Sequence, residues 1–215
     1  MILQCAIFLV SLGLMASAAP LAQKGSSRSD PDGDLRRELI RMGEKDQKYR
    51  DRMDRLMKNM PGPENKRATR EFLAVLKKQD EIDRKNIKRL DEIISRYGWP
   101  TRSMVGKEAS NAALIILQHA DLSYQKKYFP LVKEAAAGNE ALAANVATLE
   151  DRILMREGKK QIYGTQVRIN DVTRKLELYP IEDEENVDKR RAGVGLPPIA
   201  EYLKMFGLDY SPPKK

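Results

Sequence analysis

The sequence contains very few of the residues on which metal sites and disulfides depend. Its 215 residues include one cysteine, Cys5, and one histidine, His119. A single cysteine excludes an intramolecular disulfide, and this composition argues against a structural zinc site of the Cys and His type. Any metal site would depend on carboxylates, which suit hard cations. The sequence itself predicts no metal and no other cofactor.

Several common catalytic signatures are also absent. There is no glycine-rich phosphate loop, no HExxH zinc motif and no GxSxG nucleophile elbow. Aromatic residues make up 6% of the chain, with a single tryptophan, Trp99. The function therefore has to be argued from residue patterns that are less specific than these motifs.

Charged side chains are missing from the first 22 residues. Residues 1–15 are almost wholly apolar, and the small residues 16–18 and Pro20 follow. This pattern is typical of a secretory signal peptide, although the basic residues that usually open one are absent. We expect residues 1–18 to be a cleaved signal peptide and the protein to be exported, to the periplasm or beyond the cell. The alternative is an uncleaved N-terminal membrane anchor, for which about 20 apolar residues suffice.

Basic residues are in excess over acidic residues. There are 39 Lys and Arg against 31 Asp and Glu, which gives a net charge of +8. Outside the cytoplasm such a protein meets anionic lipid head groups, cell-wall polymers and acidic glycans, and nucleic acid is a poor candidate partner. The simpler explanation also stays open, because interleaved charges of both signs are typical of a surface that is charged only for solubility.

Hydrophobic periodicity predicts a mainly α fold that opens with a long helical hairpin. Residues 19–33 are rich in Gly, Ser, Asp and Pro, and we expect them to form a flexible linker. Apolar residues then recur at steps of three and four over 35–60 and again over 64–97, and a Pro-Gly-Pro sequence at 61–63 separates the two helices. Four of the seam positions are polar: Asp46, Gln79, Asp83 and Asn86.

Shorter elements follow the hairpin. Further helices are predicted over 105–120, 123–137, 140–157 and 184–192, with a last turn or two ending near Gly207. Alternating residues over 161–169, together with Leu176 and Leu178, predict one small β-hairpin near the C-terminus. We therefore expect a single mainly helical domain over 34–207 and a disordered tail over 208–215.

The first candidate site is the QHAD sequence at 118–121, at the predicted end of a helix. A histidine near a carboxylate can act as a general base, so His119 and Asp121 are candidate catalytic residues, with Asp121 orienting the ring. Gln118 would bind the ligand beside them. Arg152, on the helix before the β-hairpin, would hold an anionic group. The alternative is that His119 only caps the end of its helix.

Two further motifs offer ligand-binding side chains. In the YGTQ sequence at 163–166, a kink at the glycine could present Tyr163 and Gln166 to a ligand, or the motif could simply be a bulge that begins the hairpin. At the turn near residue 100, Trp99 could stack on a sugar and Arg102 could pair with an anion. The alternative is that Trp99 fills the core between helices.

The same motifs carry a family resemblance. They are YGWPTR at 97–102, QHAD at 118–121, YGTQ at 163–166 and PIEDEENVD at 180–188. On these motifs the chain resembles the bacterial domain-of-unknown-function family 6624, over about residues 35–203. The resemblance implies a mainly helical single domain that is sometimes exported, and it supplies no activity, substrate or catalytic residue. The segment 61–79, which extends the first two helices, is longer than expected for that family.

Three functions stay open. The leading prediction is an exported binding or interaction module, whose paired helices engage an anionic envelope component or a partner protein. The alternative is a hydrolase or transferase that uses His119 as general base on an envelope polymer or a small metabolite. That enzyme requires His119, Tyr163 and Gln166 to line one concave pocket. In the third, the motifs serve only packing and capping.

Overall fold

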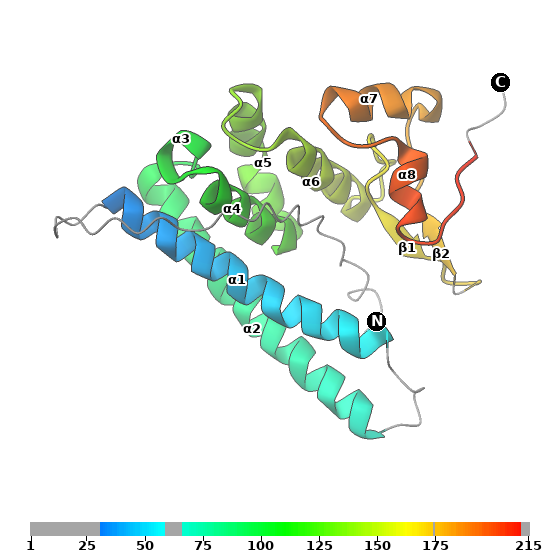
Figure 1. Ribbon diagram of the computed structural model, residues 1–215, viewed down its shortest axis with the longest axis horizontal. Coiled ribbons are helices and arrows are strands. Elements are labelled where there is room, and N and C mark those ends of the chain that lie inside the picture. Colours follow the sequence, from blue (N-terminus) through cyan, green and yellow to red (C-terminus); the bar gives the residue numbers. More distant parts are fainter. Residues whose placement is uncertain (1–30, 59–65, 174, 212–215) are drawn as a thin grey trace, which may run out of the picture.

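A computed structural model describes residues 31–58, 66–173 and 175–211 of the chain. The long helices α1 (Pro31–Lys58) and α2 (Lys66–Tyr97) lie side by side and form a hairpin (Figure 1). They run antiparallel, because Arg89 bonds to Glu38 near one end while Arg52 bonds to Glu71 near the other. The predicted mainly α class and long N-terminal hairpin are confirmed.

Helix α4 (Lys107–His119) packs closely against α1, after the short helix α3 (Arg102–Val105). A Cβ atom on Gly43 of α1 would lie 2.8 Å from the Cβ atom of Ala112 on α4. Small residues at this crossing let the two backbones approach, as the alanine-rich sequence of α4 predicts. The close approach brings the middle of α1 against the C-terminal half of α4.

The main core lies between the hairpin and the helices α4, α5 (Leu122–Ala137) and α6 (Ala143–Arg156). Apolar side chains from all five helices are fully or nearly fully buried there, among them Leu39, Leu90, Leu117, Val132 and Leu149. Burying side chains of this size contributes roughly 1.5–3 kcal/mol each. This core holds α1 and α4 in the relative position on which the site depends.

A smaller unit follows α6. The strands β1 (Val167–Ile169) and β2 (Leu176–Leu178) pair antiparallel, and η1 (Glu184–Asn186), α7 (Val187–Gly193) and α8 (Ile199–Lys204) follow them in the chain. A second cluster of buried apolar residues holds this unit together: Ile181, Val187, Ile199 and Leu203. An isolated two-stranded hairpin is marginally stable in water. The predicted β-hairpin is therefore present and stabilised by this packing.

Some boundaries differ from the prediction. Helix α1 begins at Pro31, inside the expected linker, and α6 begins at Ala143 rather than at 140. Helix α5 contains Pro130 and agrees with the predicted helix over 123–137 apart from its first residue. Leu208 and Tyr210, which the sequence assigned to a disordered tail, pack against the smaller cluster. The expected signal peptide lies outside the described residues, and within the described ranges no helix has the length and apolarity needed to cross a bilayer.

Candidate functional site

His119, the last residue of α4, meets a buried carboxylate from α1. Its Nδ1 atom lies 2.9 Å from Oδ2 of Asp46, a residue 73 positions away in the chain. Asp46 is only 1% exposed, and the His119 side chain is 6% exposed. We call these two residues the Asp46–His119 dyad. The polar seam position of α1 is therefore part of an acid–histidine pair.

A network of polar side chains surrounds the dyad and links α1 to α2. Arg50 shares the Asp46 carboxylate, with Nε 3.2 Å from Oδ2 and Nη2 3.3 Å from Oδ1. The same Nη2 lies 2.6 Å from Oδ1 of Asp83 on α2. Gln79 donates to that Asp83 oxygen at 2.6 Å and to Asp46 at 3.4 Å. The negative charge of Asp46 is thus already balanced by Arg50.

The environment favours an ionised Asp46 beside a neutral His119. Burial opposes the charge on Asp46, but hydrogen bonds from His119 and Arg50 hold its pKa well below the ordinary range. Burial lowers the pKa of His119 to about 4, although the bond to Asp46 opposes this. Burial also raises the pKa of Asp83 to about 6. At neutral pH, Nδ1 of a neutral His119 therefore donates its hydrogen to Asp46, and Nε2 is a proton acceptor.

The dyad borders a pocket of about 380 Å³ between α1, α2, the end of α4 and α6. His119 lines this pocket together with Arg50 and Asp83. Among the described residues, the hydrogen bond of the His119 ring joins Nδ1 to Asp46 and does not involve Nε2. Three apolar side chains also line the pocket: Met53, Leu76 and Ile87. The pocket therefore combines a histidine with apolar side chains and with charged side chains of both signs, and we call it the dyad pocket.

Side chains of α5 and α6 hold the C-terminal end of α4, where His119 lies, by hydrogen bonds. Arg152 Nη1 donates to the Gln118 carbonyl at 2.8 Å, and Arg156 Nη1 donates to the Ala120 carbonyl at 2.7 Å. Gln125 Nε2 donates to the Gln118 carbonyl at 2.7 Å. The last carbonyl groups of a helix lack intrahelical donors and carry a partial negative charge, so two cations there are stabilising. His119 consequently projects from an immobilised helix end.

Asp121 and Gln118 do not have the contacts with His119 that were predicted from the sequence. Asp46 orients His119, whereas the side chain of Asp121 is exposed at the N-cap of α5, where it makes no capping bond. Gln118 is buried and its side chain donates to the Asn145 carbonyl at 2.9 Å. Both residues border the dyad pocket. Neither of their side chains forms a hydrogen bond with the imidazole ring of His119.

The YGTQ motif lies outside the dyad pocket and forms a buried loop. Neither Tyr163 nor Gln166 lines that pocket, so the geometry required for a site built from His119, Tyr163 and Gln166 is absent. Gln166 is 5% exposed, and its Oε1 accepts from Arg152 Nε at 3.3 Å. Arg152 contacts both motifs, through the Gln118 carbonyl and the Gln166 side chain.

Asp151, on α6, binds the YGTQ loop through hydrogen bonds. Its carboxylate accepts the backbone N–H groups of Ile162 at 2.7 Å, Tyr163 at 3.0 Å and Thr165 at 2.9 Å, and the Thr165 hydroxyl at 2.9 Å. Burial raises the pKa of Asp151, and these four donors oppose that effect. A buried carboxylate with this many donors anchors the loop on α6.

Arg191 and a glycine complete the packing of this loop. Arg191, 0% exposed, donates to the carbonyls of Tyr163 and Pro197, both at 2.6 Å. Gly164 has φ 68°, and a Cβ atom on it would lie 2.5 Å from Cδ1 of Ile199. The motif therefore joins α6 to α8, in line with the structural alternative considered for it.

Trp99 and Arg102 do not form a shared site. Trp99 is 6% exposed and belongs to the main core, which is the alternative considered for it. Arg102 donates from Nη1 to Oδ1 of Asn139 at 3.3 Å, in the turn after α5. Among the described side chains, no three His, Cys, Asp or Glu residues gather in a way that could hold a metal ion.

Comparison with known families adds one finding. A family profile described as "Family of unknown function (DUF6624)" matches residues 33–212, which is most of the chain. The chain belongs to DUF6624. The resemblance that the motifs indicated is confirmed, and the dyad of this DUF6624 chain lies wholly within the matched region. No curated protein and no solved structure matches the chain.

Asp46, the partner of His119 in the dyad of this DUF6624 chain, was not predicted from the sequence as a site residue. Asp46, Gln79 and Asp83 stood out only as polar positions in apolar seams, and Arg50 did not stand out. One signal was available: a carboxylate buried in a helix seam needs a cation or hydrogen-bond donors. Both α1 and α2 carry such seam carboxylates, so a polar cluster between the two helices could have been predicted.

Proposed function

We propose that this DUF6624 protein is a hydrolase or transferase in which His119 is the general base, acting on an anionic envelope polymer or small metabolite. The proposed site differs from the one expected from the sequence, because Asp46 takes the place of Asp121 and neither Tyr163 nor Gln166 takes part. The observation that carries the proposal is the pairing of His119 Nδ1 with Asp46, which leaves Nε2 as a proton acceptor at the dyad pocket. A carboxylate that fixes one ring nitrogen of a neutral imidazole orients the other nitrogen for proton abstraction. Arginine side chains line the same pocket and can pair with a negatively charged group of a substrate.

The pocket offers no hydroxyl or thiol for covalent catalysis. Among the described residues that line it there is no Ser, Thr or Cys. The proton that Nε2 accepts therefore comes from water or from a hydroxyl group of a second substrate. Attack by water corresponds to hydrolysis, and attack by a substrate hydroxyl corresponds to group transfer.

We also propose that the protein acts after export. The support is the uncharged, apolar N-terminal segment with small residues before Pro20. In that location the available substrates include anionic polymers and metabolites of the envelope.

The ring of His119 gives a direct test, because it is the only histidine in the chain. Nitrogen-15 NMR of histidine-labelled protein is expected to show a neutral Nδ1–H tautomer at pH 7 and a pKa of about 4. In Asp46→Asn this pKa is expected to fall further, because Asp46 raises it through its hydrogen bond and charge. Asp121→Asn is the matched control and should leave both tautomer and pKa unchanged.

Two results would count against the general base. They are a hydrogen on Nε2 at neutral pH, and titration of the ring near the ordinary histidine pKa of about 6.5. Once a substrate is found by screening, turnover by His119→Ala should be about 100-fold or more below wild type. Unchanged turnover in that variant would eliminate the mechanism even if the tautomer is as expected.

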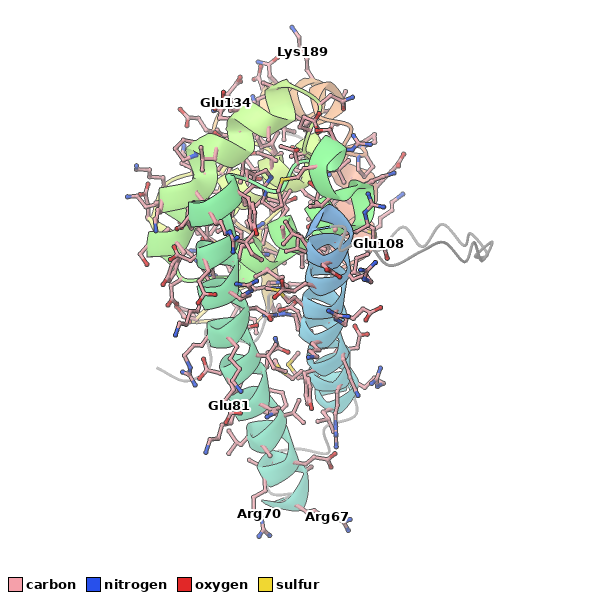
Figure 2. The ribbon with its side chains drawn as sticks, turned by 90° about the vertical axis from the view of Figure 1, so that its left-hand side faces the viewer. Arg67, Arg70, Glu81, Glu108, Glu134 and Lys189 are labelled. Carbon is pink, nitrogen blue, oxygen red and sulfur yellow. The ribbon has the colours of Figure 1, made fainter. Side chains whose placement is uncertain are left out.

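A second function is supported by the surface of the hairpin. The α1–α2 hairpin extends away from the body, with Arg67 and Arg70 at its free end (Figure 2). A hollow on α1 is lined by basic side chains beside an aromatic one, among them Lys48, Tyr49 and Arg52. On α2, Leu73 is 47% exposed. We propose that this surface binds an anionic envelope component or an acidic partner protein.

Retention on envelope fractions tests this second function. We expect the protein to bind at about 0.01 M salt and to be released above about 0.1 M, where the screening length falls from about 30 Å to about 10 Å. The double variant Lys48→Gln/Arg52→Gln should be retained less. Lys107→Gln/Lys189→Gln removes the same charge away from the hairpin and should be retained like wild type. Equal retention of both double variants would refute hairpin binding.

A further inference from the structure

Two carboxylates beside the dyad pocket share one cation. Nη2 of Arg50 lies 3.3 Å from Oδ1 of Asp46 and 2.6 Å from Oδ1 of Asp83. Nε2 of Gln79 lies near the same two oxygens, at 3.4 and 2.6 Å. Because both oxygens are within hydrogen-bond distance of the same two nitrogen atoms, the two carboxylates lie close together. Carboxylates that share a site repel each other when both are ionised, so the site favours a proton on one of them.

The contacts of the two carboxylates show which one keeps the proton. Asp46 accepts hydrogen bonds from His119, Arg50 and Gln79, and these donors favour its ionised form. The hydrogen bonds described for Asp83 come from Arg50 and Gln79, and both end on Oδ1. Oδ2 of Asp83 is therefore the oxygen that can carry a proton without losing one of these bonds.

Burial favours the same assignment. It raises the pKa of Asp83 to about 6, and the charge of Asp46 acts in the same direction, whereas Arg50 opposes it. The pKa of Asp46 is held well below the ordinary range, and that of His119 is lowered to about 4. Between about pH 4 and pH 6 the folded protein therefore holds a neutral imidazole and a neutral Asp83. In water at that pH both side chains would be charged.

Asp83 and His119 reach the dyad pocket from different helices. Asp83 is on α2, His119 is the last residue of α4, and both line the pocket. The side chain of Asp83 is 23% exposed, against 1% for Asp46. The other charged residues that line the pocket are Arg50, Asp80, Arg84, Asp121, Arg152 and Arg156. Of the two neighbouring carboxyl groups, Asp83 is thus the one that a ligand in the pocket can contact.

We infer that Asp83 is the general acid that works with His119 in the proposed reaction. The inference rests on the proposed function, and it narrows the substrate class to compounds whose leaving group is an alcohol or an amine. Such groups leave slowly as anions, and a proton donor placed beside them removes that barrier. Two titratable groups whose surroundings favour opposite roles are the usual basis of paired acid and base catalysis.

The proposed step conserves protons. Nε2 of His119 takes a proton from water while the water oxygen bonds to the electrophilic atom of the substrate. The bond to the leaving oxygen or nitrogen breaks, its electron pair stays on that atom, and the atom takes the proton from Oδ2 of Asp83. The site ends with a protonated His119 and an ionised Asp83. Loss of one proton from His119 to solvent and gain of one by Asp83 restore it.

The ring signal of His119, the only histidine, reports on Asp83 without any substrate. In the full chain we expect its nitrogen-15 shift to show a step at about pH 6, as Asp83 ionises, besides its own titration at about pH 4. Asp83→Asn keeps an acceptor for Arg50 and Gln79 and should lose the step at about pH 6. Asp80→Asn, a matched change in an exposed carboxylate of the same pocket, should keep it.

Two results of this titration would overturn the inference. They are a wild type without the step, and a step that persists in Asp83→Asn. If Asp83→Asn does not fold, Gln79→Met removes a donor to Asp83 at similar volume. The step should then move to higher pH, because the bond from Gln79 lowers the pKa of Asp83. A step that stays in place would also refute the assignment.

Thermal unfolding gives a second readout. A carboxyl group whose pKa is raised in the folded state stabilises the protein increasingly as pH falls through that pKa toward the pKa of the unfolded chain. The melting temperature of wild type, taken relative to Asp83→Asn, is therefore expected to rise between about pH 6 and pH 4. His119 is present in both proteins, so its own titration cancels in the difference. A difference that does not change with pH would contradict a protonated Asp83.

Kinetics on a substrate found by screening separates a general acid from a structural carboxylate. We expect kcat/KM to be greatest at about pH 5, and Asp83→Asn to lower it about 100-fold there. The loss should be much smaller for a 4-nitrophenol analogue, whose leaving group needs no proton. Equal losses for both leaving groups would refute the general acid. A hydrogen on Nε2 of His119 would instead refute the base, so the two proposals fail by different results.

Discussion

Replacing Asp151 with alanine is expected to lower the free energy of unfolding by about 4 kcal/mol. The variant removes the acceptor for three backbone N–H groups and for the Thr165 hydroxyl. The loop that contains these donors is buried, so water replaces the carboxylate poorly, and each unsatisfied buried donor costs about 1–3 kcal/mol. Urea denaturation followed by circular dichroism measures the loss.

Graded variants show whether the carboxylate acts through these bonds. Asp151→Asn keeps the side-chain volume but turns one acceptor into a donor, and it should cost about 3 kcal/mol. Thr165→Val removes only the hydroxyl bond and should cost about 1 kcal/mol. Glu150→Gln, a neighbouring carboxyl that pairs with Lys133 at 3.3 Å, should cost less than about 1 kcal/mol. If Asp151→Asn costs no more than Glu150→Gln, the anchoring role is wrong.

Gly164→Ala is expected to destabilise the protein by about 3 kcal/mol. Two effects combine at this position. The φ angle of 68° disfavours any residue with a Cβ atom, and that atom would lie 2.5 Å from Ile199 Cδ1 and 2.8 Å from Ile181 Cδ1. Both isoleucines belong to the smaller cluster, so the clash has to be relieved by moving α8 or the segment before η1.

Gly158→Ala is the matched control for this prediction. Gly158 has φ 72°, and a Cβ atom there would meet nothing within 4 Å. Its substitution adds only the backbone strain, about 1–2 kcal/mol. Thermal unfolding of both variants measures the difference, which isolates the clash with Ile199 and Ile181. Equal melting temperatures would mean that the smaller cluster yields to the extra methyl group without cost.

The helices were predictable because their signals are local. The hairpin is marked by apolar residues that recur every three or four positions, by Pro-Gly-Pro at 61–63 and by Gly98 after α2. None of these signals depends on another part of the chain. The boundary of α1 was less certain, since Pro31 is tolerated in the first turn of a helix and also occurs in linkers. Burial in the main core then determines which predicted helix faces lie inside.

The partner of His119 could not be predicted in the same way. The nearest carboxylate in the sequence is Asp121, but residues two apart at a helix end point in different directions, and Asp46 reaches the ring from 73 residues away. Only the packing of α1 on α4, through Gly43 and Ala112, makes that contact possible.

The role of the YGTQ motif could not be predicted from the motif alone. Its glycine and polar side chains fit a ligand loop and a buried structural loop equally well when only the motif is considered. The two roles differ in what the loop is hydrogen-bonded to. Here its partners are Asp151 and Arg191, which lie elsewhere in the chain. A motif can therefore mark a family by its packing role as well as by a ligand.

The two halves of the dyad come from the middle of α1 and from the end of α4, so the proposed general base is not present in either segment alone. In a nascent or unfolded chain the imidazole is separated from Asp46 by 73 residues and is solvated, with an ordinary histidine pKa. Closing a loop of that length has to await the docking of the hairpin. If His119 is the proposed general base, an unfolded chain would therefore lack an oriented imidazole, and the base would form only when the folded protein completes its core.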